Sequence, residues 1–201
     1  MKKLFLSLVM MLSVMASFAQ YEAGTFSIRP EVGINASSLL ITANDGKNFI
    51  FGETNTKLGL VVGAEVDYQA NSWFGISAGA LYTQLGANGA TGADVTMKYD
   101  YVAVPVLANF YPYKGLCLKT GIQPAFNIKA KATQKGAAMP YSDDNIRKFD
   151  FEIPIGISYE VGGFIFDARY FVGVGNILKN DPTGTMRNSS TQVTIGYKFH
   201  L

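Results

Sequence analysis

Few residues of this chain have the types and spacing that catalysis or metal binding requires. The sequence contains one histidine, His200, and one cysteine, Cys117. A Ser-His-Asp triad or a histidine acid/base needs an imidazole held in place, and the penultimate residue of a chain is a poor place to hold one. Zinc sites combine several Cys, His or carboxylate ligands, so one Cys and one His are weak evidence for such a site. These residues indicate a protein that is not an enzyme and that uses no cofactor.

Two other features could carry chemistry, and each has a simpler interpretation. Asp143-Asp144-Asn145 offers oxygen ligands that suit a hard cation such as Ca²⁺, but a solvated loop would look the same. Cys117 lacks a partner for an intramolecular disulfide, so it reads as a small buried residue.

The charged residues are more informative, because many of them alternate with apolar residues along extended segments. On the predicted register the following residues share the polar face: Arg29, Glu31, Lys57, Glu65, Asp67, Lys119, Lys129, Lys148, Asp150, Glu152, Asp167, Arg169 and Lys198. Both signs are present in near balance. Such a set could line an ion path, or it could form a network of ion pairs that fills an interior. We expect a network centred on Asp150, Glu152, Asp167 and Arg169.

The elements that carry these charges are eight segments of alternating hydropathy, which is a strand signal. They span residues 26–35, 57–68, 73–85, 97–111, 116–130, 148–160, 164–174 and 191–199. Pro30, Pro105, Pro124 and Pro154 lie within them, and each proline removes one hydrogen-bond donor of the ladder. We therefore expect bulges or strand ends at these positions.

The connections between the segments alternate in length. Short turns lie at residues 69–72, 112–115 and 161–163, whereas the connections at 37–56, 86–96, 131–147 and 175–190 are longer and polar. This rhythm predicts an all-β fold, an eight-stranded antiparallel transmembrane β-barrel with both termini in the periplasm and the long loops outside the cell.

The first residues resemble a secretory signal peptide. Lys2 and Lys3 precede an apolar run, and Ser17-Phe18-Ala19 provides small residues before Gln20. We expect residues 1–19 to be removed and residues 20–201 to form one barrel domain. Because the chain has 17 basic and 15 acidic residues, loss of these two lysines leaves equal numbers, which argues against nucleic-acid binding.

Alternation alone does not separate a membrane barrel from a soluble lipocalin, which has its apolar residues inside. Two observations favour the membrane. Glycine is concentrated on the polar face, which suits the narrow interior of eight strands. Aromatic residues gather at the segment ends on the apolar face, as in the aromatic girdles of outer-membrane barrels. Tyr197 and Phe199 belong to the last segment, and we expect them to act as the insertion signal.

Several short motifs resemble the PorT-like family of outer-membrane β-barrels. They are Ala19-Gln20, Tyr101-Val102-Ala103-Val104-Pro105-Val106, Gly121-Ile122-Gln123-Pro124, Asp167-Ala168-Arg169-Tyr170-Phe171-Val172-Gly173 and Gly196-Tyr197-Lys198-Phe199. The resemblance implies an eight-stranded barrel whose Val102, Val104 and Val106 face lipid. It also implies, as one alternative, a role as an accessory subunit of a protein secretion machine.

We therefore expect an exported, non-enzymatic protein of the cell outer membrane with a lumen plugged by charges. Its extracellular loops would act in envelope integrity or in binding a protein partner. The alternatives are the secretion subunit and a small ion or solute channel. The expected partners are the lipid bilayer, lipopolysaccharide, and the barrel-assembly machinery during insertion.

Overall fold

The computed structural model describes residues 22–44, 49–53, 55–88, 95–134, 137–138, 147–177 and 184–201. The signal peptide expected at residues 1–19 and the Asp143-Asp144-Asn145 motif lie outside them. The strands in this part of the chain are β1 (Thr25–Asn44), β2 (Phe49–Glu53), β3 (Asn55–Asn71), β4 (Phe74–Asn88), β5 (Val95–Ala103), β6 (Val106–Tyr113), β7 (Leu116–Gln134), β8 (Ala137–Ala138), β9 (Phe149–Val161), β10 (Phe164–Gly173), β11 (Gly184–Tyr197) and β12 (Phe199–His200). None of the described segments is a helix long and apolar enough to cross a membrane.

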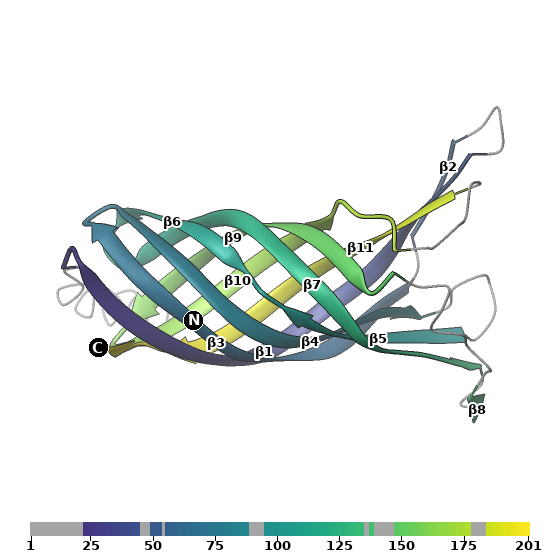
Figure 1. The fold of residues 1–201 in the computed structure, drawn as a ribbon, viewed down its shortest axis with the longest axis horizontal. Helices are drawn as coiled ribbons and strands as arrows, with labels where there is room; N and C mark the ends of the chain where they lie inside the picture. Colours follow the sequence, from purple (N-terminus) through teal and green to yellow (C-terminus); the bar gives the residue numbers. More distant parts are fainter. Residues whose placement is uncertain are drawn as a thin grey trace, which may run out of the picture.

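The strands close into a barrel of eight antiparallel strand positions, counted over the described residues, which confirms the predicted eight-stranded antiparallel barrel (Figure 1). β5 and β6 together occupy one of the eight positions, between β4 and β7. β12 continues the position of β11. The ring closes where β1 pairs with β11, from Glu31 opposite Gly196 to Ala43 opposite Gly184. Closure leaves the ring without an exposed sheet edge.

The two mouths of the barrel differ. The turns at residues 72–73, 114–115 and 162–163 lie at one mouth, here called the turn end. The chain also ends there, because the backbone nitrogen of Leu201 donates to the oxygen of Phe26 at 3.0 Å. At the opposite mouth β2 and the adjoining part of β1 extend beyond the ring, and we call this the projecting end (Figure 1).

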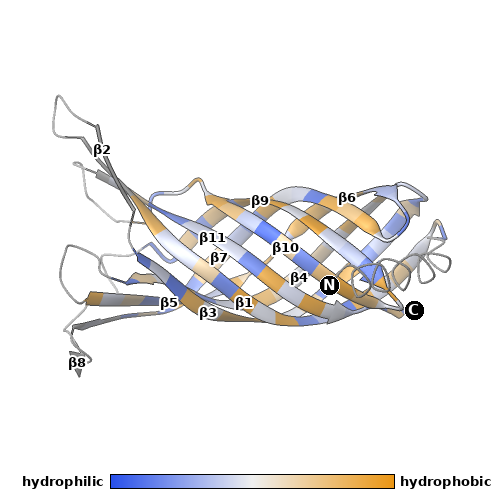
Figure 2. Cartoon of the chain, turned by 180° about the vertical axis from the view of Figure 1, so that it is seen from behind, coloured by the Kyte–Doolittle hydropathy of each residue, from blue (hydrophilic) through white to orange (hydrophobic). Residues whose placement is uncertain are grey.

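The barrel wall is apolar outside and polar inside, the reverse of a soluble lipocalin. Hydrophobic and hydrophilic residues alternate along the strands (Figure 2). On β9 the side chain of Ile155 is 59% exposed, whereas Glu152 on the opposite face is 1% exposed. Val106 on β6 likewise faces outward, and Leu107 faces inward. An apolar outer surface of this kind is the lipid-facing belt of a membrane barrel.

Several strands are longer at the projecting end than we predicted. β1 continues to Asn44, β7 to Gln134, and β11 begins at Gly184, so parts of the predicted loops 37–56, 131–147 and 175–190 are strand. The β1–β11 register continues without a break through this region. Sequences such as Ser37-Ser38 and Asn188-Ser189-Ser190 are polar at successive positions. The alternating hydropathy therefore fades there, while the backbone pairing persists.

The prolines are accommodated at interruptions of the ladder. Pro105 separates β5 from β6, and the gap is bridged because Val104 N donates to Pro124 O at 2.8 Å. Pro154 lies where the β7–β9 pairing is interrupted, between Thr120 opposite Ile155 and Gln123 opposite Glu152. Pro30 lies in the short gap between the β1–β12 and β1–β11 pairings.

One irregularity in β7 corrects the predicted orientation of a lysine. Asp100 of β5 pairs with Lys129, but the next residue, Tyr101, pairs with Asn127. The extra residue, Ile128, reverses the faces beyond it. Lys129, predicted to point inward, is therefore exposed, and Ala130 is buried in its place. Lys148, also predicted to point inward, is exposed because it precedes the first residue of β9.

Candidate functional site

The lumen is the candidate functional site, and glycines on its wall make room for its long side chains. A Cβ at Gly156 of β9 would lie 2.9 Å from Cγ of Arg169. At Gly196 of β11 it would lie 3.0 Å from Cγ of Arg29. The interior of eight strands is barely wide enough for its own side chains, so each arginine needs a small neighbour.

Arg169 and Asp167, both on β10, form one half of a central ion-pair network. Arg169 Nε lies 2.8 Å from Asp167 Oδ1, and its Nη1 lies 2.5 Å from Glu65 Oε1 on β3. Asp167 Oδ2 also accepts from Lys119 Nζ of β7 at 2.6 Å and from Arg29 Nη1 of β1 at 3.4 Å. The network thus joins four strands across the lumen.

Arg29 forms the other half. It donates to Glu65 through Nη2, and its Nε lies 3.5 Å from Asp67 Oδ2. Glu31 Oε2 lies between the two arginines, 3.3 Å from Nη1 of Arg29 and 3.6 Å from Nη2 of Arg169. The central network therefore contains Arg29, Glu31, Glu65, Asp67, Lys119, Asp167 and Arg169. All seven side chains are buried.

Lys198 lies apart from this network, near the turn end. Its Nζ donates to Glu160 Oε2 at 2.7 Å. Both residues line a small cavity with Cys117 and Ser158, where the Cys117 side chain is buried. His200 is exposed in β12, opposite Ser27 of β1.

Asp150 and Glu152, which we expected at the centre of the network, occupy a separate layer nearer the projecting end. Glu152 Oε2 accepts from Gln123 Nε2 at 2.6 Å. Asp150 Oδ2 accepts from Asn188 Nδ2 at 2.6 Å, and its Oδ1 accepts from the backbone nitrogen of Phe151 at 2.8 Å. Both belong to β9, whereas the two arginines pair with acids of β1, β3 and β10, so the ion pairs form without them.

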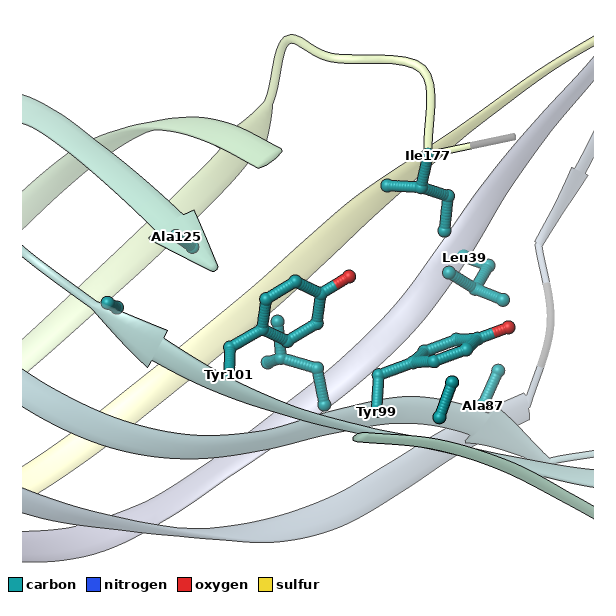
Figure 3. Close-up of a cluster of buried hydrophobic side chains, with 9 residues drawn as sticks. Leu39, Ala87, Tyr99, Tyr101, Ala125 and Ile177 are labelled. Atoms are coloured by element: carbon teal, nitrogen blue, oxygen red, sulfur yellow. The ribbon is translucent and has the colours of Figure 1, made fainter. Parts of the chain in front are cut away.

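A cluster of apolar side chains covers this layer at the projecting end, and we call it the apolar cap (Figure 3). It consists of Leu39, Leu85, Ala87, Tyr99, Tyr101, Ala103, Ala125, Ala130 and Ile177, with Met97 and Met186 packed against it. The resemblance that turns Val102, Val104 and Val106 to lipid implies that Tyr101 lies on the inner face. Leu39 and Ile177 fall in predicted loops, so no alternating pattern indicated that they lie in the lumen.

Ile177 reaches the cap from the segment that follows β10. Its nitrogen donates to Met186 O at 2.9 Å, and its oxygen accepts from Arg147 N at 2.8 Å. Val174 N, three residues earlier, donates to Phe151 O at 2.9 Å. These bonds fold the segment over the mouth, with the Ile177 side chain fully buried beside Leu39 (Figure 3).

Tyr197 and Phe199, the predicted insertion signal, lie on the outer surface at the turn end. Their rings are 4.8 Å apart, and the ring of Tyr197 is 5.0 Å from that of Phe164 on β10. Lys198 between them points into the lumen. The three rings form an aromatic patch beside the seam where β12 meets β1.

The chain resembles known outer-membrane barrels in sequence and in fold. Residues 18–179 match the family described as "Outer membrane protein beta-barrel domain". Ail, the attachment invasion locus protein of Yersinia pestis, solved in complex with the heparin analogue sucrose octasulfate, is 16% identical with a TM-score of 0.50. That match covers 89% of this chain and 100% of Ail.

Neisserial surface protein A (NspA) gives a similar result. It is 15% identical with a TM-score of 0.51, and the match covers 87% of this chain and 97% of NspA. Likenesses at this level of identity concern the fold alone. No curated protein matches the chain.

Proposed function

Because the chain belongs to the family of outer membrane protein beta-barrel domains, we propose that it is a non-enzymatic, non-conducting barrel that acts through its projecting end. That end would bind a partner outside the cell or support the integrity of the envelope. The filled lumen is the observation that carries this proposal.

Two barriers in series support a closed lumen. The central network occupies the middle of the barrel with side chains from β1, β3, β7 and β10. The apolar cap then fills the mouth at the projecting end with side chains that are at most 9% exposed. A solute would have to displace both, because the interior of eight strands leaves little further space.

The projecting end is the part of the molecule best suited to contact a partner. The extended strands there continue beyond the outer apolar belt, and β2 adds a further strand to β1. We propose that this end lies outside the cell, that the chain ends and the short turns face the periplasm, and that residues 1–19 are removed during export.

Two alternatives would use the molecule differently. The resemblance of its motifs to the PorT-like family points to an accessory subunit of a secretion machine, whose partner would be another subunit in the same membrane. A small channel would need a continuous aqueous path. The two barriers in the lumen argue against such a path.

Conductance tests the closed lumen. Wild-type protein in planar bilayers should show no steady, porin-like current. A large and stable single-channel current would contradict the proposal and favour the channel. If such a channel exists, the ion selectivity of its current should change in correctly folded Arg169→Ala protein.

Trimming tests the role of the projecting end. Residues 41–54 would be replaced by a short Asn-Gly turn, and the variant would be expressed in cells that lack the native protein. We expect a barrel that still resists denaturation by detergent but leaves the cells with the same envelope or binding defect as no protein. Full restoration by the trimmed barrel would contradict the proposal.

Crosslinking from Arg187→Cys to a secretion subunit would favour the first alternative, the accessory subunit of a secretion machine.

A further inference from the structure

The layer formed by Asp150 and Glu152 lacks the positive charge that the central network contains. Within the described chain, no Lys or Arg nitrogen lies within 4.0 Å of either carboxylate. Both side chains are nevertheless buried, each 1% exposed. A buried carboxylate is costly unless it is paired, protonated or bound to a metal ion. The layer therefore needs a positive charge or a proton that the described side chains do not supply.

Unpaired oxygen atoms accompany this missing charge. Glu152 Oε1, Gln123 Oε1 and Asn188 Oδ1 are buried and have no hydrogen-bond partner among the residues that the structure describes. They belong to residues that already contact the two carboxylates, since Gln123 binds Glu152 and Asn188 binds Asp150. Buried atoms elsewhere in the described lumen also lack a partner, such as Glu31 Oε1 and Asn35 Oδ1. In this layer, however, three such oxygens accompany two carboxylates that have no described cation within 4.0 Å, and together they point to a missing electrophile.

The backbone brings these groups to one level of the lumen. Gln123 of β7 is the direct neighbour of Glu152 on β9, and Asp150 lies two residues away on the same face. Asn188 of β11 reaches Asp150 because β10 ends at Gly173. A Cβ at Gly175 would lie 3.0 Å from Asp150 Oδ1, so glycine leaves room there. Tyr101, whose hydroxyl lies 3.5 Å from Asn188 Nδ2, covers the group from the side of the cap.

We propose that Asp150, Glu152, Gln123 and Asn188 bind a divalent hard cation of the Ca²⁺ type inside the barrel. Two carboxylates balance a double positive charge, and all the atoms available as metal ligands are oxygens. Ca²⁺ accepts carboxylate and amide oxygens in flexible geometry, whereas Mg²⁺ demands a near-ideal octahedron and retains its waters. The cation would join β7, β9 and β11 in the layer that the ion pairs leave open.

Thermal unfolding in detergent tests this site with added metal ions as the probe. Protein refolded in EDTA would be titrated with CaCl₂, MgCl₂ or NaCl at constant ionic strength. We expect Ca²⁺ to raise the unfolding midpoint saturably, Mg²⁺ to raise it less, and Na⁺ to leave it unchanged. The double variant Asp150→Asn, Glu152→Gln should lose the response to Ca²⁺. In EDTA it should unfold at a higher temperature than the wild type, because the repulsion between carboxylates is gone.

Glu160→Gln is the matched control. It removes a lumen carboxylate that is bound to Lys198 near the turn end, so it should retain the full response to Ca²⁺. The proposal fails if wild type does not respond to Ca²⁺, or if the double variant responds as strongly as wild type. A midpoint that depends on pH but not on Ca²⁺ would show that the two carboxylates share a proton instead.

Terbium luminescence provides a direct measurement if the double variant does not fold. Tb³⁺ at the site should be excited through Tyr101, with one ion per chain, and excess Ca²⁺ should displace it. Tyr101→Phe should reduce the emission but keep the stabilisation by Ca²⁺. Emission that is unchanged in Tyr101→Phe would place the bound ion elsewhere and overturn the proposal.

Discussion

Arg169 is one of the two arginines at the centre of the ion-pair network. It is fully buried, and its guanidinium contacts Asp167, Glu65 and Glu31 on three strands. A buried ion pair gains little over well-packed apolar residues, but removing one partner leaves the others charged and unpaired. Without Arg169, the three buried carboxylates would share only Arg29 and Lys119 as cationic partners within the described network.

The first prediction concerns this residue. Arg169→Ala should lower the stability of the barrel by about 3–5 kcal/mol, because Glu31, Glu65 and Asp167 each lose one of their buried cationic partners. Unfolding in urea, followed by the change in electrophoretic mobility of the folded barrel, would measure the loss. Lys131→Ala, which removes an exposed lysine beyond the bulge, is the control and should leave stability unchanged. Equal stability of Arg169→Ala and wild type would show that the network is not important for folding.

At this scale the sequence predicted most of the inward-pointing charges, with Lys129 and Lys148 as exceptions, but not how they pair. Alternation along one strand was enough to place Arg29, Glu65 and Arg169 on the polar face. Pairing depends on the stagger between strands, which alternation along a single strand does not contain. For that reason Glu152 was expected beside Arg169, although it binds Gln123.

At the scale of the strand, single residues change the regular pattern. Ile128 adds one residue to β7 and reverses the orientation of Lys129, and Pro105 divides one predicted strand in two. The proline was recognisable in the sequence as a break in the ladder. The bulge was not recognisable in the sequence, because Ile128 fits the apolar face whether or not the pairing register shifts there.

The second prediction concerns the last strand segments, β11 and β12. Replacing both Tyr197 and Phe199 with Ser should leave an unassembled, protease-sensitive chain, because their rings form the outer patch beside the closing seam. Protease digestion of isolated membranes would measure assembly.

A matched aromatic pair provides the control. Phe126 and Phe149 lie 5.5 Å apart on β7 and β9, and replacing both with Ser removes the same kind of contact away from the seam. We expect that control to assemble. Normal assembly of the Tyr197, Phe199 variant would show that the insertion signal lies elsewhere.

For the whole molecule, the difference between the two mouths is the basis of the proposed orientation in the membrane. The first and last described residues and the short turns share one mouth, and the extended strands share the other. The closed barrel, and which face of each strand points inward, were predictable from eight alternating segments. The extent of the strands beyond the membrane was not, since polar strands and polar loops have similar composition.

The third prediction tests this orientation. Lys131→Cys and Arg187→Cys should react with a membrane-impermeant maleimide on intact cells, because both positions are exposed near the projecting end. Lys114→Cys at a short turn should react only after the outer membrane is permeabilised. Cys117 is buried and should give little background. The opposite labelling pattern would reverse the assigned orientation.

The pairing of β1 with β11 also determines the order of events during folding. Glu31 pairs with Gly196, so β1 cannot pair with β11 until almost the whole chain is present. Contacts of such high sequence separation slow folding. During that wait the edge of β1 has unpaired backbone groups, each of which would cost several kcal/mol in lipid.

A circular permutant would separate the seam from the chain ends. Leu201 already lies next to Phe26, so a short linker could join the termini while new ends open at Lys114 and Gly115. The ring would keep all its pairings, but β6 and β7 would become the last strands to meet. We expect this permutant to reach the same unfolding midpoint in detergent. Its assembly in cells should fail, because Tyr197 and Phe199 would no longer lie near the C-terminus.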